Sequence, residues 1–216
     1  MTECTPRYGE RPLTQTVAAA GALRRLTGLL LSLEHEHPTV DAMLAQFADW
    51  ERELATAAAP DPTPRIGAGG EEQRVYLDHA FDVGAYNPCF PEYTFDHLDD
   101  ETASGRVTFP LVYEGPPGLG NGGFLAVFFD SITQHQSCAA QRTGKTRSLT
   151  VTFRRPTPVL TELHFDIARS EEEGRVTSTV RLLLDDEVLC IGELKTVATS
   201  PDKLTGFQFG KRRVEN

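Results

Sequence analysis

Cysteine and basic residues are scarce in this sequence, and their scarcity excludes several classes of protein. The four cysteines of the 216 residues, Cys4, Cys89, Cys138 and Cys190, show no CxxC spacing and do not resemble a disulfide framework. We therefore expect free thiols in a reducing compartment. The formal net charge is −10, which argues against nucleic acid as a partner, because phosphate binding requires a basic face.

Long hydrophobic runs and recognisable targeting segments are also missing. No stretch approaches the roughly 18 uninterrupted apolar residues of a membrane-spanning helix, and the start, MTECTPRYGERPL, does not resemble a secretory signal. No GxSxG nucleophile motif occurs. His35 and His37 lie in a Glu-His-Glu-His run without a second pair of ligands nearby, so no metal site is expected. We expect a cytoplasmic protein that has no membrane partner.

The hydrophobic pattern divides the chain into a helical part and a strand-rich part. The length suits one domain with an extension, and 39% hydrophobic residues suit a packed core. Apolar residues recur at helical spacing from Leu23 to Leu33 and from Pro38 to Leu54. These patterns predict an N-terminal helical extension (1–58), a linker rich in proline and glycine (59–72), a main domain (73–200) and a C-terminal tail (201–216) that is mobile from Phe207.

The main domain is predicted to be α+β, with antiparallel strands and one long helix. Alternation of apolar and polar residues, with turn residues between the runs, is typical of strands. A further edge strand is expected within residues 73–82. The helix runs from about 122 to 141 and is apolar around most of its circumference, so it should be buried. The main strands are predicted at 92–98, 105–112, 146–155, 163–170, 175–184 and 188–198.

A glycine loop precedes this helix. Residues 118–123 (GLGNGG) match GxGxxG formally, but no acid follows about 20 residues later and the chain lacks βαβ units, so dinucleotide binding is excluded. Glycines at a helix start, such as Gly122, let a ligand approach backbone N–H groups that could hold an oxyanion. Asp130 is a lone carboxylate two turns further on. It faces a polar cavity, a partner or an interface, or it is a structural residue bonded to backbone.

Two segments carry a family resemblance. The runs YEGPPGLGNGGFLAVFFDSITQ and TRSLTVTFRRPTPVLTEL resemble the hotdog-fold thioesterase superfamily, in particular its PaaI-like acyl-CoA thioesterases. These carry YEG-x-PG-x-x-HGG, an acid seven residues after the last glycine, and later Y-x-RP-x-P. The resemblance covers about 87–198. It implies a hotdog fold, in which a curled antiparallel sheet surrounds a long central helix, and a homodimer or dimer of dimers with sites at the subunit interface.

The resemblance also implies roles for individual residues. Asp130 takes the place of the catalytic carboxylate, acting as general base or nucleophile, and the Gly123 backbone N–H takes that of the oxyanion hole. Thr146 falls where the family has a Ser or Thr that reaches in from the neighbouring subunit and orients water. Asn121 stands where the family usually has histidine. An amide can hydrogen-bond a thioester carbonyl but cannot transfer a full proton.

An acyl-CoA substrate needs cations for its phosphates and apolar surface for its acyl chain. Guanidinium groups bind phosphate well, and a basic cluster flanks the end of the long helix and the strand after it. Any single cation of this cluster could equally be a charge that keeps a sheet edge soluble. Phe124 is a candidate for acyl contact, with Phe128 and Phe129, although each could equally be a core residue. No cofactor is expected, since coenzyme A is part of the substrate. The basic cluster comprises Arg142, Lys145, Arg147, Arg154 and Arg155.

Three functions remain open at this point. The first is hydrolysis of an acyl-CoA thioester through Asp130. The second is a non-catalytic acyl-CoA-binding module, favoured by Asn121 and by the extension. The third is a hotdog hydratase or dehydratase, which pairs a catalytic histidine with an acid; His79 and His97 are not in helpful sequence contexts. The extension is expected to pack across the sheet or the dimer interface, with Phe47 and Trp50 as anchors.

Overall fold

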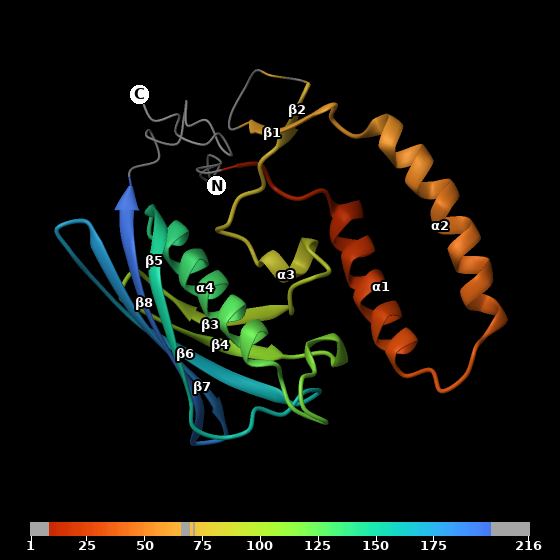
Figure 1. Cartoon of the computed structure of the whole chain (residues 1–216). Coiled ribbons are helices and arrows are strands. Elements are labelled where there is room, and N and C mark those ends of the chain that lie inside the picture. The colour runs from red at the N-terminus through yellow and green to blue at the C-terminus, as the bar shows by residue number, and fades with distance from the viewer. Residues whose placement is uncertain (1–8, 66–69, 71, 200–216) are drawn as a thin grey trace, which may run out of the picture.

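Six antiparallel strands form one curled, open sheet (Figure 1). The structure, a computed structural model, describes residues 9–65, 70 and 72–199. Every neighbouring pair of strands in the order β3-β4-β6-β7-β8-β5 is antiparallel, which leaves β3 and β5 as the two edges. The strands are β3 (Tyr93–Leu98), β4 (Thr102–Thr108), β5 (Thr143–Phe153), β6 (Glu162–Glu172), β7 (Arg175–Leu184) and β8 (Glu187–Thr199).

The long helix α4 (Gly122–Ala139) lies in the concave face of this sheet (Figure 1). Leu125, Phe128, Phe129 and Ile132 form its inner face and are at most 2% exposed. Gly192 on β8 makes the close approach possible, because a Cβ there would lie 2.6 Å from the Phe129 ring. This confirms the predicted hotdog arrangement of a curled antiparallel sheet around a central helix.

The N-terminal extension is helical, as predicted, and consists of α1 (Thr14–Leu31) and α2 (Pro38–Ala57). The first residue of α2, Pro38, has no N–H to leave unbonded. His37 precedes it and accepts a 3.2 Å hydrogen bond at Nδ1 from the Thr39 N–H, so it caps the helix. No cluster of metal-ligating side chains occurs among the residues that the structure describes.

The chain between the extension and the sheet contains more regular structure than the sequence suggested. The predicted linker holds a short strand, β1 (Asp61–Arg65), which pairs in parallel with β2 (Gln73–Val75). The expected edge strand at 73–82 is therefore corrected, because only Gln73–Val75 of this range form a strand and that strand does not join the main sheet. Two further short helices are α3 (Val83–Tyr86) and the 3₁₀ turn η1 (Leu111–Tyr113). The tail at 201–216 lies outside the described residues.

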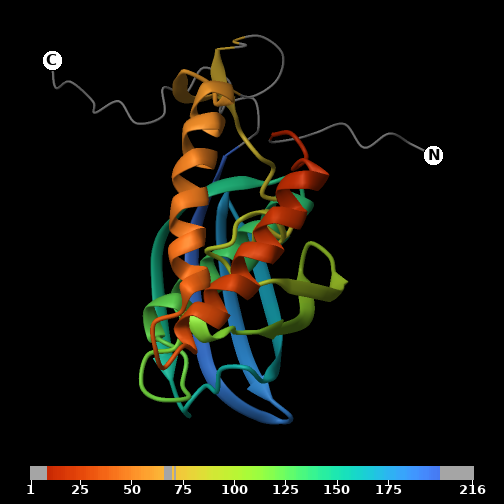
Figure 2. The same cartoon turned by 90° about the vertical axis from the view of Figure 1, so that its right-hand side faces the viewer.

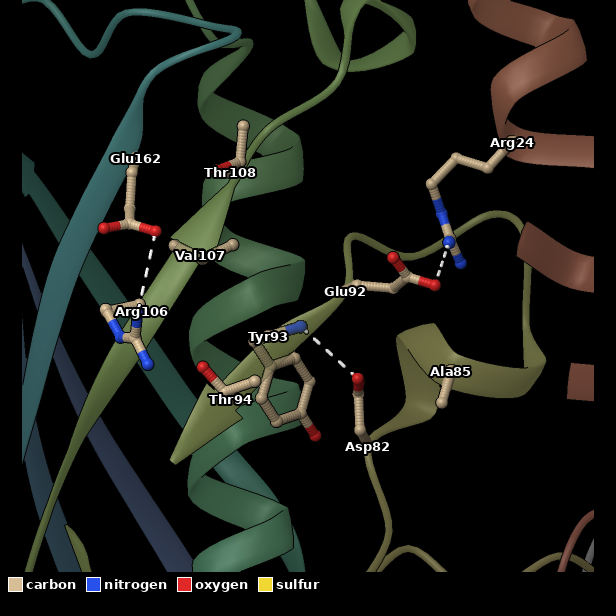
Figure 3. A pocket seen from close by; sticks show the side chains of 10 residues that line it. All are labelled: Arg24, Asp82, Ala85, Glu92, Tyr93, Thr94, Arg106, Val107, Thr108 and Glu162. Carbon is tan, nitrogen blue, oxygen red and sulfur yellow. Dashed lines mark hydrogen bonds and ion pairs between the residues drawn. The ribbon is translucent and has the colours of Figure 1, made fainter. Parts of the chain in front are cut away.

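Helix α1 is fastened to the body through one arginine. Arg24 is 8% exposed and donates hydrogen bonds to three backbone carbonyls, of Phe90 (3.1 Å), Asn87 (3.3 Å) and Gly84. It also forms a 2.7 Å ion pair with Glu92 (Figure 3). The carbonyls belong to α3 and the loop that follows it, so this guanidinium holds α1 against the chain that leads into β3.

Helix α2 stands outside α1 and buries none of its residues (Figures 1 and 2). Trp50 is 48% exposed and its ring contacts Phe47, with centroids 5.8 Å apart. The expectation that Phe47 and Trp50 anchor the extension on the sheet is therefore corrected: α1 makes the contact, against α3 and η1. Their place in a dimer interface stays a prediction. None of the described helices has the length and hydropathy needed to cross a membrane.

Candidate active site

Asp130 projects from the middle of α4 toward the edge strand β5. Thr146 on β5 donates a 2.6 Å hydrogen bond from its hydroxyl to Oδ1 of Asp130. Asp130 is half-buried and Thr146 is exposed, so one carboxylate oxygen has a fixed partner while the pair stays open to solvent. The resemblance implied that this threonine comes from a neighbouring subunit. The structure makes the contact within one chain.

A bulge in β5 explains why Thr146 faces α4. Alternation with Leu149 and Val151 as inward residues would turn Thr146 to the outer face. The register against β8 shifts between Thr146 and Ser148, so Arg147 is an extra residue without an opposite partner. An extra residue reverses the alternation on one side of it, and bulges often re-aim a side chain in this way. The Thr146 hydroxyl consequently reaches Asp130.

The glycine loop before α4 is held in place by backbone hydrogen bonds. Asn121 N–H donates to the Tyr113 carbonyl at 2.8 Å, and Gly120 N–H donates to the Thr157 carbonyl at 2.8 Å. Gly118 adopts a left-handed φ of 75°, which favours glycine. The loop is thus bonded both to η1 and to Thr157, which follows the Arg154-Arg155-Pro156 sequence. These bonds fix the position at which α4 begins.

Asn121 caps α4 and occupies the N–H that was predicted to form the oxyanion hole. Its side-chain Oδ1 accepts a 2.8 Å hydrogen bond from the Gly123 N–H. Asparagine is among the best N-cap residues because its oxygen satisfies such a free donor. The Gly123 N–H is therefore already hydrogen-bonded in this structure. A ligand oxygen could accept from it only by displacing the Asn121 Oδ1 atom.

Apolar side chains border the start of α4 on its outward side. Phe124 is 38% and Val127 is 43% exposed, and the Phe124 ring meets Tyr113 edge-on at 4.8 Å between centroids. Phe153, at the end of β5, is 56% exposed and lies over Gly122, where a Cβ would be 2.7 Å from the ring. These side chains form an open apolar surface one to two turns from Asp130.

The predicted phosphate-binding cations differ in how they are paired. Arg155 forms a 2.7 Å ion pair with Glu187, and Arg142 a 3.2 Å ion pair with Glu171. Arg147 at the bulge and Arg154 beyond the end of β5 are exposed, and no described acid is ion-paired with either. Arg147 neighbours Thr146 in the chain and so lies beside the candidate site.

His79, whose sequence context did not indicate a catalytic role, is half-buried, and its Nε2 lies 3.2 Å from the Tyr76 hydroxyl. Burial lowers the pKa of the His79 imidazole, while the negative charges of Asp78 and Asp130 act in the opposite direction. Nothing in the sequence indicated this electrostatic relation, because His79 and Asp130 are 51 residues apart in the chain and the range that includes His79 was predicted only as an edge strand. His97, by contrast, pairs with Asp99 at 2.7 Å on the exposed end of β3.

A separate pocket of about 400 Å³ lies where α1 and α3 meet β3 and β4 (Figure 3). Its lining includes Arg24, Asp82 and Glu92, and none of the predicted site residues. Burial raises the pKa of Asp82 to about 6, although its carboxylate accepts hydrogen bonds from the Gly84 and Tyr93 N–H groups. This pocket is part of the joint between the extension and the sheet.

Solved structures share this architecture. A crystal structure of a thioesterase superfamily protein matches with a TM-score of 0.69 at 22% identity, covering 88% of this chain and 98% of that one. A hypothetical thioesterase from Streptococcus pneumoniae, solved with coenzyme A, matches at 13% identity, 50% and 90% coverage and a TM-score of 0.48. Thioesterase superfamily member 2 from Mus musculus matches at 16% identity with a TM-score of 0.45, covering 49% of this chain and 80% of that one. No protein-family model and no curated protein matches the sequence.

The first of these likenesses shows the fold: the chain has the hotdog fold of thioesterase superfamily proteins, as the resemblance implied. The matched share of 88% is larger than residues 59–216 alone could supply, so the likeness in fold reaches into part of the N-terminal extension.

Proposed function

We propose that this protein is an acyl-CoA thioesterase that hydrolyses its substrate through Asp130. The observation that carries the proposal is the 2.6 Å hydrogen bond between Thr146 and Asp130, on a part of α4 that is open to solvent. A carboxylate in an otherwise apolar helix is costly to bury unless it is used or paired. Here one oxygen is paired with Thr146 and the other remains available to water or substrate.

The reaction needs a base, an oxyanion donor and a place for the leaving thiolate. As general base, Asp130 takes a proton from water while the water oxygen attacks the thioester carbonyl carbon, and the C–S bond then breaks to release coenzyme A. As nucleophile, its carboxylate attacks the carbonyl carbon, the C–S bond breaks and coenzyme A leaves as a thiolate, and water then hydrolyses the mixed anhydride to release the acid and restore Asp130. Thr146 holds the carboxylate in orientation along either route.

The start of α4 supplies the proposed oxyanion donor. The Gly123 N–H lies at the positive end of the helix dipole, where developing negative charge is stabilised. In the free protein this donor is held by Asn121 at 2.8 Å. We propose that the thioester oxygen takes the place of the Asn121 amide when substrate binds, and that Asn121 then hydrogen-bonds nearby.

Coenzyme A and the acyl group need separate surfaces around this centre. The acyl chain would lie on the open apolar surface of Phe124. The Phe153 ring lies over Gly122 in the free protein, so the thioester would reach the main chain at Gly122 by displacing this exposed ring. Arg147 and Arg154 suit the phosphates, and Arg155 would join them on leaving Glu187, its ion-pair partner at 2.7 Å. No cofactor is needed beyond the coenzyme A of the substrate.

The proposed assembly is a homodimer or a dimer of dimers. The edge strand β5 spans eleven residues and carries Thr146 beside Asp130, so a second copy joined there would adjoin the site. An unpaired edge of this length is a ready surface for strand pairing. Light scattering on the purified chain tests the assembly, and a monomer at all concentrations would contradict it.

A second candidate function is non-catalytic binding of acyl-CoA. The specific observation that favours it is the Asn121 cap, because it blocks the Gly123 N–H and replaces the histidine usual in the resembling proteins. A module of this kind would bind acyl-CoA with the same apolar and basic surfaces and release no thiol.

Thiol release from a panel of aliphatic and aromatic acyl-CoAs separates these functions. We expect turnover by the native chain and a loss of about 100- to 10,000-fold in Asp130→Asn, the usual range for removing a general base. Asp186→Asn, in an exposed turn, is the matched control and should keep full activity. An enoyl-CoA in the panel tests hydration. Binding without thiol release by the native chain would replace hydrolysis with the binding function.

A further inference from the structure

The exposed Gly123 at the start of α4 has an aromatic side chain on each side. An α-helix turns by about 100° per residue, so the residues before and after Gly123 point to opposite sides of it. Gly122, on one side, lies under the Phe153 ring, whose Cζ atom would be 2.7 Å from a Cβ there. Phe124, on the other side, carries the second ring. A group that accepts a hydrogen bond from the Gly123 N–H therefore lies between two aromatic rings.

The two rings differ in how firmly they are held. Phe124 is 38% exposed and meets the Tyr113 ring edge-on, with centroids 4.8 Å apart, and Tyr113 itself is 2% exposed. Phe153 is 56% exposed, so its ring can turn away from Gly122 without opening the packed core. The Phe124 side is therefore fixed, and the Phe153 side is the one that can adjust.

The main chain that carries Phe153 is held by the sheet. Strand β5 pairs with β8 up to and including Phe153. Directly after it, the N–H groups of Arg154 and Arg155 both donate to the Leu189 carbonyl, at 2.8 and 3.0 Å. These bonds do not involve the side chain of Phe153, so a substitution there leaves the end of β5 in place. The volume of the side chain at position 153 then decides how much room is left over the start of α4.

We propose that Phe153 is a specificity-determining residue, which selects acyl groups that are unbranched at the carbon next to the thioester carbonyl. The inference rests on the proposed function, in which the thioester oxygen accepts from the Gly123 N–H. The carbonyl and the carbon beside it then lie between Phe124 and the displaced Phe153 ring. A straight chain fits flat between two rings, whereas a methyl branch projects toward one of them. Since Phe124 is fixed, the branch must push the Phe153 ring further out.

Two acyl-CoAs of equal composition and different shape test this selectivity. Butanoyl-CoA and 2-methylpropanoyl-CoA are isomers, so they differ in branching next to the carbonyl and not in their number of carbon atoms. We would measure kcat/KM for thiol release from each by the native chain, Phe153→Ala and Phe153→Trp. Leu29→Ala is the control, because Leu29 is 66% exposed on α1 and its loss removes an exposed apolar side chain from another element.

The native chain should prefer the straight isomer. Phe153→Ala should raise the ratio of branched to straight kcat/KM by about tenfold, near the low end of what one methyl group decides in an apolar pocket. Phe153→Trp should lower this ratio because its ring is larger, and Leu29→Ala should keep the native value. A general disturbance of the fold does not shift the ratio in opposite directions in the two variants. No preference in the native chain, an unchanged ratio in Phe153→Ala, or a shift in the same direction in both variants would overturn the proposal.

A binding experiment separates this inference from the question of hydrolysis. In 2-oxopentyl-CoA and 3-methyl-2-oxobutyl-CoA a methylene stands between sulfur and carbonyl, so these thioethers present a straight or a branched carbonyl group and release no thiol. Calorimetry should give a lower Kd for the straight compound, and Phe153→Ala should reduce the difference. This selectivity without thiol release from any acyl-CoA would contradict hydrolysis alone. Thiol release without an effect of position 153 would contradict this inference alone, and neither binding nor thiol release would contradict both.

Discussion

Thr146 and Asp130 are 16 residues apart in the chain and meet through one hydrogen bond of 2.6 Å between hydroxyl and carboxylate. The bond joins the central helix to the edge strand of the sheet, and it exists because a bulge at Arg147 turns Thr146 inward. Without the bulge, Thr146 would lie on the outer face of the sheet and could not reach Asp130. The predictions below begin with this pair.

Replacing Thr146 by valine should slow thioester hydrolysis without unfolding the protein. Valine keeps the branched shape and removes the hydroxyl, and a hydrogen bond to a charged group is worth about 1.5–3 kcal/mol. If that energy acts in the transition state, kcat/KM falls by about 10- to 100-fold. Thr146→Ser retains the hydroxyl and should stay within a few-fold of the native rate. Equal rates for valine and threonine would show that the hydroxyl has no part in the reaction.

Replacing Asn121 by glycine should release the Gly123 N–H. Glycine is itself a tolerated N-cap, so the cost in stability is only a few tenths of a kcal/mol. A neutral hydrogen bond of about 0.5–1.5 kcal/mol no longer has to be broken when the thioester oxygen binds. We expect kcat/KM to rise by up to about tenfold. A fall in kcat would instead mean that the Asn121 amide contacts the reacting group.

The sequence predicted the hotdog core well because its strands alternate and its turns are marked. Strands β6, β7 and β8 lie within a few residues of the predicted ranges, and α4 begins at the predicted Gly122. Strand β4 begins at Thr102, three residues earlier than predicted. It ends at Thr108 and not at 112, because Pro110 and the 3₁₀ turn η1 end the extended chain. Local pattern fixes the existence of an element more firmly than its ends.

The candidate site was predicted only in part, since some of its determinants are not local. The bulge that turns Thr146 toward Asp130 breaks the alternation on which the strand prediction relied. The Asn121 cap is a local contact with the Gly123 N–H, but the resemblance directed the prediction toward a catalytic role for Asn121 and not toward an N-cap. Phe47 and Trp50 misled because an apolar helical stripe signals burial, yet α2 leaves this stripe uncovered within the described chain.

Arg24 should be the main anchor of the extension. Arg24→Ala removes the donor to three carbonyls and the partner of Glu92, so we expect unfolding to become easier by about 2–4 kcal/mol. Thermal or urea unfolding measures this, with Arg25→Ala, an exposed neighbour on the same helix, as control. Unchanged stability in Arg24→Ala would show that α1 contributes nothing by docking on α3.

The exposed side chains of α2 should contribute little to the stability of the single chain. Trp50 and Leu54 are 48% and 69% exposed, and α2 buries no residue. Trp50→Ala and Leu54→Ala should each change the free energy of unfolding by less than about 0.5 kcal/mol at low protein concentration. A loss that grows with protein concentration would place these residues in a contact between subunits.

Acidification should destabilise the protein through His135. Burial lowers the pKa of this imidazole to about 4 from its ordinary 6.5. Between these values the unfolded chain binds the extra proton and the folded chain does not, so stability falls as pH falls from 6.5 to 4. The contribution is up to roughly 3 kcal/mol. Urea unfolding of the native chain and of His135→Gln across this range should show their difference shrinking toward acid pH, and a constant difference would contradict this account.

A double-mutant cycle on Asp130 and Thr146 tests the central claim most directly. The measurement is kcat/KM for thiol release by the native chain, Asp130→Asn, Thr146→Val and the double variant. If Thr146 acts by orienting the Asp130 carboxylate, the double variant should be about as slow as Asp130→Asn alone, because the hydroxyl has no role once the base is gone. Losses that multiply in the double variant, or an Asp130→Asn that remains fully active, would contradict the account.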